Sequence, residues 1–248
     1  MQCWGLTDPG CVRKQNQDAY RIERLDRNNL LCVVCDGMGG AKSGNIASTL
    51  AVEVFVEEIR RCWKPGMDAE KTDQMLRSAV KLANFTVFDQ AAQFEEFDGM
   101  GTTLVAVLIQ GKKATVVNVG DSRAYLMRSG AISRVTKDHT LVEEMVSQGL
   151  ITEREARVHP RRNLVTRALG TSESVEVDLI QLDVRPGEVI LICSDGLSNY
   201  VPEHDLLRVT TGEGEWQEKL RELVGIALNA GGSDNITAML ATFEEESR

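Results

Sequence analysis

Short apolar segments that follow one another with only a turn between them constrain the fold of this chain most. Between residues 102 and 136 they are TTLVAVLIQ, KATVVNVG, SRAYLMRSG and AISRVT, all rich in valine, isoleucine, leucine or tyrosine. Each has the composition of a β-strand, and RSGA between Met127 and Ile132 has that of a hairpin turn. Because a connection of a few residues joins only antiparallel neighbours, this pattern predicts antiparallel sheets.

Helices are expected in pairs rather than after every strand. Residues 43–63 and 68–94 have apolar side chains at helical spacing, and a third such pattern begins near Trp216. The expected buried positions are Ile46, Leu50, Val54 and Ile59 in the first helix and Met75, Ala79, Leu82, Phe85 and Val87 in the second. Further strands are expected in CWGLTD, QDAYRIERL, NLLCVVCD, DLIQLDV, EVILICSD and NITAMLATF. This order predicts an α+β fold, a four-layer α-β-β-α sandwich of two stacked, mostly antiparallel β-sheets flanked by pairs of helices.

One polar segment interrupts the strands. Between Lys137 and Arg167 the sequence is helical in pattern but polar, and Gly149 and Pro160 break it. No linker, repeat or low-complexity tract divides the chain. We therefore expect residues 1–248 to form a single domain, with a small helical lid, or flap, inserted at about residues 138–167.

Charge and cysteine usage exclude several classes of protein. The net charge is −9, and an acidic surface is poorly suited to bind nucleic acid. No stretch approaches the ~18 apolar residues that cross a bilayer, and the N-terminus has no secretory signal. We expect a cytoplasmic protein that binds neither membrane nor nucleic acid, with its six cysteines reduced. Cys32 and Cys35 form a CxxC, but within a strand they would point to opposite faces.

Aspartates recur at the ends of strands or in glycine-rich turns. They are Asp18, Asp36, Asp121, Asp195 and Asp234. A single Asp-Gly is more often an ordinary turn than a ligand. If the strand ends converge, however, so many carboxylates need protons or cations among them. Carboxylates without neighbouring cysteine or histidine suit Mg²⁺ or Mn²⁺, with the Gly37 carbonyl as a possible further oxygen ligand. The pattern predicts a two-metal site.

Seven short motifs occur in one fixed order between Arg13 and Thr237. They are RxxNxD at 13–18, DGMGG at 36–40, GT at 101–102, GDSR at 120–123, KDH at 137–139, SDGL at 194–197 and GGSDNIT at 231–237. Together they resemble those of the metal-dependent type 2C serine/threonine protein phosphatases, the PPM family, in its compact bacterial form. The resemblance implies a phosphatase catalytic domain that acts in bacterial signalling.

The resemblance also implies roles for individual residues. The metal ligands of a binuclear Mn²⁺ or Mg²⁺ centre would be Asp18, Asp36, the Gly37 carbonyl, Asp195 and Asp234. A third, weaker metal would bind Asp121 and share Asp195. The catalytic set would be Arg13, Asp36 and Asp195, with Arg13 holding the substrate phosphate.

The activity implied is hydrolysis of phosphoserine and phosphothreonine by direct attack of a water or hydroxide that bridges the metals, without a phosphoenzyme. Expected partners are phosphorylated proteins, including a serine/threonine kinase and its substrates, and the expected state is a monomer. Two alternatives stay open: a catalytically silent phosphoprotein-binding module on the same fold, and a two-metal nuclease, which the charge of −9 opposes.

The chain departs from the family at the proton donor. Many relatives have a histidine in or just after the DGxxG loop, where this chain has Met38 and Ala41. A water on the third metal, His139 and His159 are the alternatives. A structural role is favoured for His139, and a solvated position on the lid is favoured for His159. Arg157, Arg161, Arg162 and Arg167 of the lid are candidates for contacts with acidic or phosphorylated segments, and pairing with Glu153 and Glu155 is the competing explanation.

Overall fold

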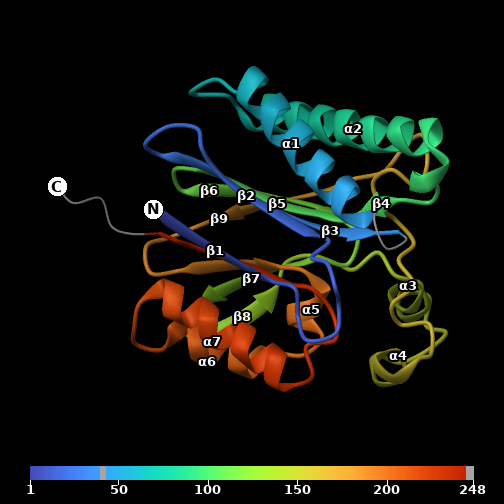
Figure 1. The fold of residues 1–248 in the computed structure, drawn as a ribbon. Helices are drawn as coiled ribbons and strands as arrows, with labels where there is room; N and C mark the ends of the chain where they lie inside the picture. Colours follow the sequence, from blue (N-terminus) through green and yellow to red (C-terminus); the bar gives the residue numbers. More distant parts are fainter. Residues whose placement is uncertain (40–42, 244–248) are drawn as a thin grey trace.

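The structure is a computed structural model that describes residues 1–39 and 43–243. Within these residues two sheets are stacked face to face, and every strand pairing in them is antiparallel (Figure 1). The first sheet has the order β1 (Gln2–Asp8), β11 (Ile236–Thr242), β10 (Val189–Cys193), β7 (Arg123–Arg128) and β8 (Ala131–Arg134). The second has the order β2 (Asp18–Arg24), β3 (Asn29–Met38), β5 (Leu104–Gln110), β6 (Lys113–Val119) and β9 (Asp178–Asp183), with the short β4 (Gly101–Thr102) beside β3.

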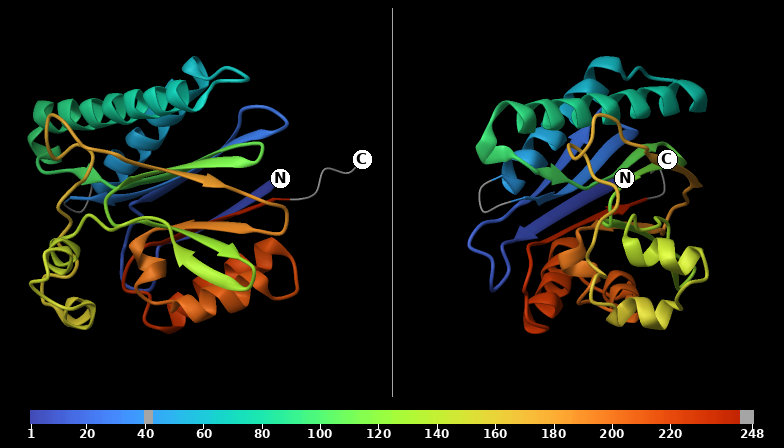
Figure 2. Two further views of the ribbon diagram at one scale, coloured as in Figure 1. Left: turned by 180° about the vertical axis from the view of Figure 1, so that it is seen from behind. Right: turned by 90° about the vertical axis from the view of Figure 1, so that its right-hand side faces the viewer.

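Helices cover both outer faces of the stacked sheets (Figures 1 and 2). The long helices α1 (Gly44–Cys62) and α2 (Ala69–Gln93) cover the second sheet, and α2 is followed by the 3₁₀ helix η1 (Glu95–Phe97). The helices α6 (Glu203–Thr211) and α7 (Trp216–Asn229) cover the first sheet, next to the single turn α5 (Asp195–Ser198). Three apolar cores separate the four layers, which confirms the predicted α-β-β-α sandwich.

The hairpin between β7 and β8 forms where the sequence predicts it. Arg128 pairs with Ala131, so Ser129 and Gly130 are the two turn residues. Their φ angles are 52° and 74°, as in the type I′ turn that fits the twist of paired strands.

The buried faces of α1 and α2 differ from the prediction. In α1 the side chains that pack on the sheet include Ala47, Ala51 and Phe55, whereas Ile46, Leu50 and Val54 are only half-buried. In α2, Met75, Ala79 and Val87 are buried as predicted, but Leu82 and Phe85 are 41% and 56% exposed. Ile59 of α1 is buried as predicted. The small Ala47 and Ala51 share the buried face of α1 with the large Phe55, so side-chain size alone does not mark this face.

The two cysteines of the CxxC lie in different cores. Cys32 lies in the core between the sheets, and Cys35 lies in the core beneath α1 and α2. The alternation of side chains along β3 therefore holds, and the two sulfurs do not share one face.

The polar segment predicted as a lid contains two short helices, α3 (Leu141–Ser147) and α4 (Glu153–Val158). They lie beside the end of the sandwich where β3 ends (Figure 1). Both ends of the segment are anchored: Thr140 bridges to Val165, and Leu141 N–H donates to the Leu164 carbonyl at 2.9 Å. Whether this segment acts as a lid stays a prediction. Nowhere in the described chain is a helix long and apolar enough to cross a membrane.

Candidate metal centre

Strand register brings the predicted aspartates to one end of the sandwich. In the second sheet, Asp18 at the start of β2 is paired with Asp36 near the end of β3. Asp121 follows β6, whose last residue lies opposite the first residue of β5, at the same end. In the first sheet, Asp195 follows β10 and Asp234 precedes β11, and these two strands are neighbours. Ends of strands from both sheets thus carry acidic side chains toward one region.

The carboxylates act on one another electrostatically. Burial, together with the charges of Asp18, Asp195, Asp121 and Asp234, raises the pKa of Asp36 well above its usual range. Burial is also the main cause that raises the pKa of Asp18 to about 6 and that of Asp121 to about 7, and Asp195 adds to both shifts. The pKa of Asp195 is raised by burial and by Asp234. A cluster of buried carboxylates of this kind needs either protons or cations to compensate its negative charge at neutral pH.

Asp18 has one satisfied carboxylate oxygen and one orphan. Its Oδ2 accepts hydrogen bonds from Ser194 Oγ at 2.8 Å and from Thr237 Oγ1 at 2.6 Å. Its Oδ1 is buried and has no hydrogen-bond partner. A buried carboxylate oxygen without a donor is costly, and a metal ion or a metal-bound water would satisfy it.

The donor set fits Mg²⁺ or Mn²⁺ held with the help of water. Among the residues that the structure describes, no three histidine, cysteine, aspartate or glutamate side chains are grouped closely enough to hold one ion. Hard cations of this kind commonly bind one or two carboxylates and keep several waters. The oxygen-only surroundings and the orphan atom of Asp18 therefore fit such ions, with side chains supplying part of each coordination shell.

Asp36 is held firmly through its backbone. Its N–H donates to Thr103 Oγ1 at 2.9 Å, and its carbonyl accepts from Thr102 Oγ1 at 2.9 Å. Thr103 Oγ1 lies 2.7 Å from Ser122 Oγ, which follows Asp121. The threonine of the GT motif, which sequence reasoning left without a task, thus positions Asp36.

Arg13 lies at the edge of the acidic group. Its Nη2 donates to Asp234 Oδ2 at 2.8 Å, and half of its side-chain surface is exposed. The bond to Asp234 and the charges of Asp234, Asp36 and Asp195 raise the pKa of Arg13. A guanidinium that is partly open to solvent beside this group is placed to bind an incoming phosphate.

The glycines after Asp36 and Asp195 serve packing. A Cβ on Gly37 would lie 2.0 Å from the carbonyl oxygen of Gly44 at the start of α1. A Cβ on Gly196 would lie 1.9 Å from the carbonyl oxygen of Asn235. Close contacts with the backbone of other segments therefore require glycine at both positions.

Asn235 joins two segments of the site, and sequence reasoning gave it no role. Its side-chain carbonyl accepts from Gln17 N–H at 2.8 Å. Its amide donates to the carbonyls of Pro9 and Gln15 at 2.9 and 3.0 Å. Asn235 thereby fixes the β1–β2 loop that carries Arg13 against the turn that carries Asp234. Its place in the GGSDNIT motif was the available signal.

His139 is a structural residue. The Gly120 N–H donates to His139 Nδ1 at 3.0 Å, so the ring proton lies on Nε2, 3.1 Å from Asp178 Oδ2. Burial lowers the pKa of His139, which favours the neutral ring. Both ring nitrogens are engaged, so His139 has none free to protonate a leaving group. His159 lies at the end of α4, where its Nδ1 accepts from Arg161 N–H. Met38 lies at the end of β3, and Ala41 falls outside the described residues.

The arginines of the lid segment fall into two groups. Arg167 is tied to the body of the protein, since its Nη1 donates to Asp178 Oδ1 at 3.1 Å. Arg157, Arg161 and Arg162 are exposed. In the part of the chain that the structure covers, no ion pair joins them to Glu153 or Glu155. Glu155 instead accepts a hydrogen bond from the backbone N–H of Thr152, the N-cap residue of α4.

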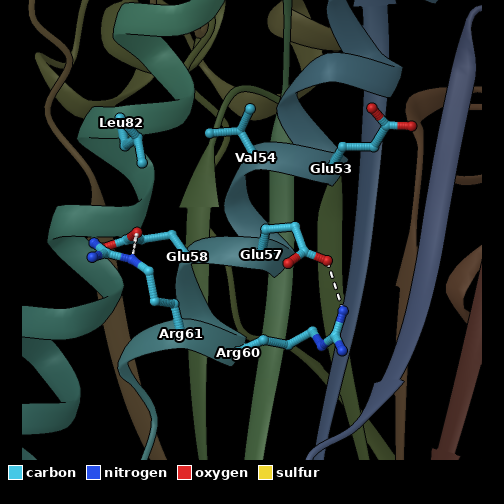
Figure 3. Close-up of a pocket in the computed structure, with 7 residues that line it drawn as sticks. All are labelled: Glu53, Val54, Glu57, Glu58, Arg60, Arg61 and Leu82. Carbon is cyan, nitrogen blue, oxygen red and sulfur yellow. Dashed lines mark hydrogen bonds and ion pairs between the residues drawn. The ribbon is translucent and has the colours of Figure 1, made fainter.

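A hollow on the outer side of α1 and α2 carries a different chemistry (Figure 3). Four of its charged side chains form two ion pairs: Glu58 contacts Arg61 and Glu57 contacts Arg60, each at 2.7 Å. None of the predicted ligands lines it. The acidic end of the sandwich, and not this hollow, is the candidate site.

Comparisons with known proteins agree with this geometry. A model of the protein phosphatase 2C family matches residues 12–241. The serine/threonine phosphatase stp of Listeria monocytogenes is 35% identical over 94% of this chain and 92% of its own length. The crystal structure of the serine/threonine phosphatase Stp1 from Staphylococcus aureus superposes with a TM-score of 0.90 at 35% identity, covering 98% of this chain and 95% of that one. The catalytic domain of the phosphatase PstP in complex with two manganese ions superposes with a TM-score of 0.85 at 33% identity, covering 98% of each chain.

Proposed function

This chain belongs to the protein phosphatase 2C family and is a serine/threonine phosphatase, and from that premise we propose that the acidic end of the sandwich is its catalytic centre. The family and the relative that holds manganese indicate dependence on divalent metal ions. The alternatives of a nuclease and a silent binding module find no support in these relatives, which are named as phosphatases.

The observation that carries the proposal is the convergence of carboxylates from both sheets around a buried oxygen with no partner. We propose that two ions, Mn²⁺ or Mg²⁺, are held by Asp18, Asp36, the Gly37 carbonyl, Asp195 and Asp234. A third ion would bind Asp121 and share Asp195. When bound, such ions supply a hydroxide for direct attack on phosphorus and stabilise charge on the transferring phosphoryl group.

The chain's own residues bind and orient the substrate. Arg13 is placed to hold the phosphate with its guanidinium, which is free on the side away from Asp234. Asn235 keeps the loop of Arg13 in place. Because His139 is engaged on both nitrogens, we propose that the leaving alcohol takes its proton from solvent at the site rather than from a histidine.

We propose that the substrates are phosphorylated proteins, including a serine/threonine kinase and its targets. Relatives named as serine/threonine phosphatases support this proposal. We further propose that residues 1–248 act as one monomeric catalytic domain in the cytoplasm. Light scattering on the purified protein and fractionation of cells test the last two points.

The direct test removes a proposed ligand. Asp36→Ala and Asp195→Ala should each abolish Mn²⁺-dependent hydrolysis of p-nitrophenyl phosphate and of a phosphothreonine peptide, because each aspartate contributes to the charge that holds the ions. Both variants should also lose most of the rise in melting temperature that Mn²⁺ causes in the parent protein.

Asp89→Ala is the matched control, since Asp89 is exposed on α2 and lies outside the predicted motifs. It should keep both the activity and the thermal response to Mn²⁺. Near-normal kcat in Asp36→Ala or Asp195→Ala, with a native circular dichroism spectrum, would show that the site is assigned wrongly.

A further inference from the structure

Two cysteines from different sheets meet in the core between the sheets. Cys3 lies on β1 of the first sheet and Cys32 on β3 of the second, and their sulfurs are 3.0 Å apart. They are 29 positions apart in the sequence. The contact therefore depends on the stacking of the sheets and could not be inferred from the spacing of the cysteines.

The surroundings hold both sulfurs in place. Cys3 is paired with Ala241 of β11, and Cys32 is paired with Ile22 of β2 and Val107 of β5. Cys32 is 1% exposed, whereas Cys3 is only half-buried at the edge of its sheet. The hydrogen bond to Cys3 and, after it, burial raise the pKa of Cys32, so Cys32 is held as a thiol. A small oxidant therefore reaches Cys3 first.

The remaining cysteines lack such a neighbour. Cys11 is exposed and lies near the Leu228 carbonyl, and Cys62 contacts Glu58. Cys35 and Cys193 are buried in other cores. Within the described residues, no second pair of cysteine sulfurs is in contact, so the Cys3–Cys32 pair differs from the rest by geometry.

We propose that Cys3 and Cys32 form a reversible disulfide that joins the two sheets when the protein meets a small peroxide. In the first step the Cys3 thiol is oxidised by hydrogen peroxide to a sulfenic acid, and one water is released. In the second step the Cys32 sulfur attacks the Cys3 sulfur, an S–S bond forms, and the Cys3–OH bond breaks. The departing hydroxyl takes the Cys32 proton and leaves as a second water.

The geometry requires little movement. A disulfide has its sulfurs about 2.05 Å apart, so the two sulfurs need to approach by roughly 1 Å. Disulfides that join the two sheets of a β-sandwich are a known arrangement in other folds. A dithiol reductant reverses the bond by exchange.

The cross-link should stabilise the fold, because it closes a loop between β1 and β3 in the unfolded chain and so lowers the conformational entropy of the unfolded state. We expect the melting temperature of the oxidised protein to lie roughly 5–10 °C above that of the reduced protein. Dithiothreitol should abolish this difference. The proposed metal ligands lie at the other end of β3. Because bound metal would also raise the melting temperature, the shift should be measured in EDTA, where metal binding makes no contribution.

The experiment maps the bond in the Cys11→Ser variant. Trypsin releases Cys3 in the peptide 1–13, which in the parent also contains Cys11, and Cys32 in the peptide 28–42, which also contains Cys35. After treatment with hydrogen peroxide, mass spectrometry should find these peptides joined and two hydrogens lighter than their sum. Fragment ions should place the bond on Cys32 and not on Cys35.

Two variants separate this bond from other oxidation. Cys3→Ser should lose both the joined peptide and the rise in melting temperature, whereas Cys62→Ser, also half-buried, should keep both. The proposal is overturned if peroxide yields only sulfinic or sulfonic acid at Cys3. It is equally overturned if the bond maps to Cys35, or if Cys3→Ser retains the thermal shift.

Discussion

At the acidic end of the sandwich, the contacts of each residue indicate whether it serves substrate binding or the stability of the fold. Arg13 touches Asp234 and is half exposed, while Gly196 is enclosed by backbone. A substitution of Arg13 should therefore affect the binding of substrate, and a substitution of Gly196 should affect the stability of the fold. The two consequences are measured differently.

Arg13→Ala should raise KM for p-nitrophenyl phosphate by roughly tenfold, because a charge-assisted hydrogen bond to phosphate contributes on the order of 1.5 kcal/mol. The kcat should change less, since the proposed task is to capture the phosphate. Arg13→Lys should restore only part of the affinity, because an ammonium does not match two phosphate oxygens as a guanidinium does. A fall in kcat at unchanged KM would contradict this role.

Gly196→Ala should lower the free energy of unfolding by about 1–3 kcal/mol, the range typical of overpacking. The added methyl group would collide with the carbonyl oxygen of Asn235. Gly225→Ala in α7 is the control, because open space surrounds that glycine and alanine favours a helix. Urea denaturation in EDTA measures both; equal stability of the two variants would show that the backbone contact at Gly196 is unimportant.

At the scale of elements, the polar segment with α3 and α4 is anchored at its two ends but presents exposed arginines between them. Arg123 binds Asp138 with two nitrogens at the start of the segment, and Thr140 bridges to Val165 near its end. The part between these anchors can therefore change without loosening them. We propose that residues 138–167 form a lid that selects among phosphorylated substrates, and this arrangement supports the proposal.

Replacing the exposed Arg157, Arg161 and Arg162 together by alanine should lower kcat/KM for phosphoproteins with acidic flanking residues several-fold. Hydrolysis of p-nitrophenyl phosphate should stay within about twofold of the parent, because this small substrate has no acidic flanking residues for the three arginines to contact. Arg154→Ala, also exposed on α4, is the single-charge control. Removal of Ser147–Arg162 should have the same selective effect, and equal loss on both kinds of substrate would argue against a lid that selects.

At the scale of the whole molecule, the clustered carboxylates set how stability responds to pH and to metal. In the metal-free protein the folded-state pKa of Asp18 is about 6, above the value near 3.9 of an unfolded aspartate. The folded state therefore binds more protons than the unfolded state between these pH values. This contribution to stability is fully present below pH 4 and is lost as pH rises through 6.

We expect the metal-free protein, kept in EDTA, to lose on the order of 3 kcal/mol of unfolding free energy between pH 4 and pH 7 through Asp18 alone. Asp121, with a pKa of about 7, extends the decline to slightly higher pH. Saturating Mn²⁺ should remove the decline near neutral pH, because bound cations replace the protons. Urea denaturation across this range tests the prediction.

Asp18→Asn separates this effect from the general response of the protein to pH. The amide cannot ionise, so the variant should show a shallower decline in EDTA and a smaller gain from Mn²⁺. A parent protein that is as stable at pH 8 as at pH 5 without metal would contradict the electrostatic picture.

The sequence by itself determined the layers of the sandwich, the β7–β8 hairpin and the opposite faces of Cys32 and Cys35. These features follow from the alternation of side chains and from turn residues, which act over a few neighbouring positions. The order of the motifs likewise gave the family, which the comparisons confirm. The assignment of each aspartate to a metal stays a prediction.

Only the tertiary structure decided which contacts those elements make. It leaves Leu82 and Phe85 of α2 exposed, gives Gly37 and Gly196 their packing role, engages both nitrogens of His139 and brings Cys3 beside Cys32. Each of these contacts joins segments that are distant in the chain. Their geometry depends on how the sheets and helices stack in the whole molecule, and a local sequence pattern does not determine this stacking.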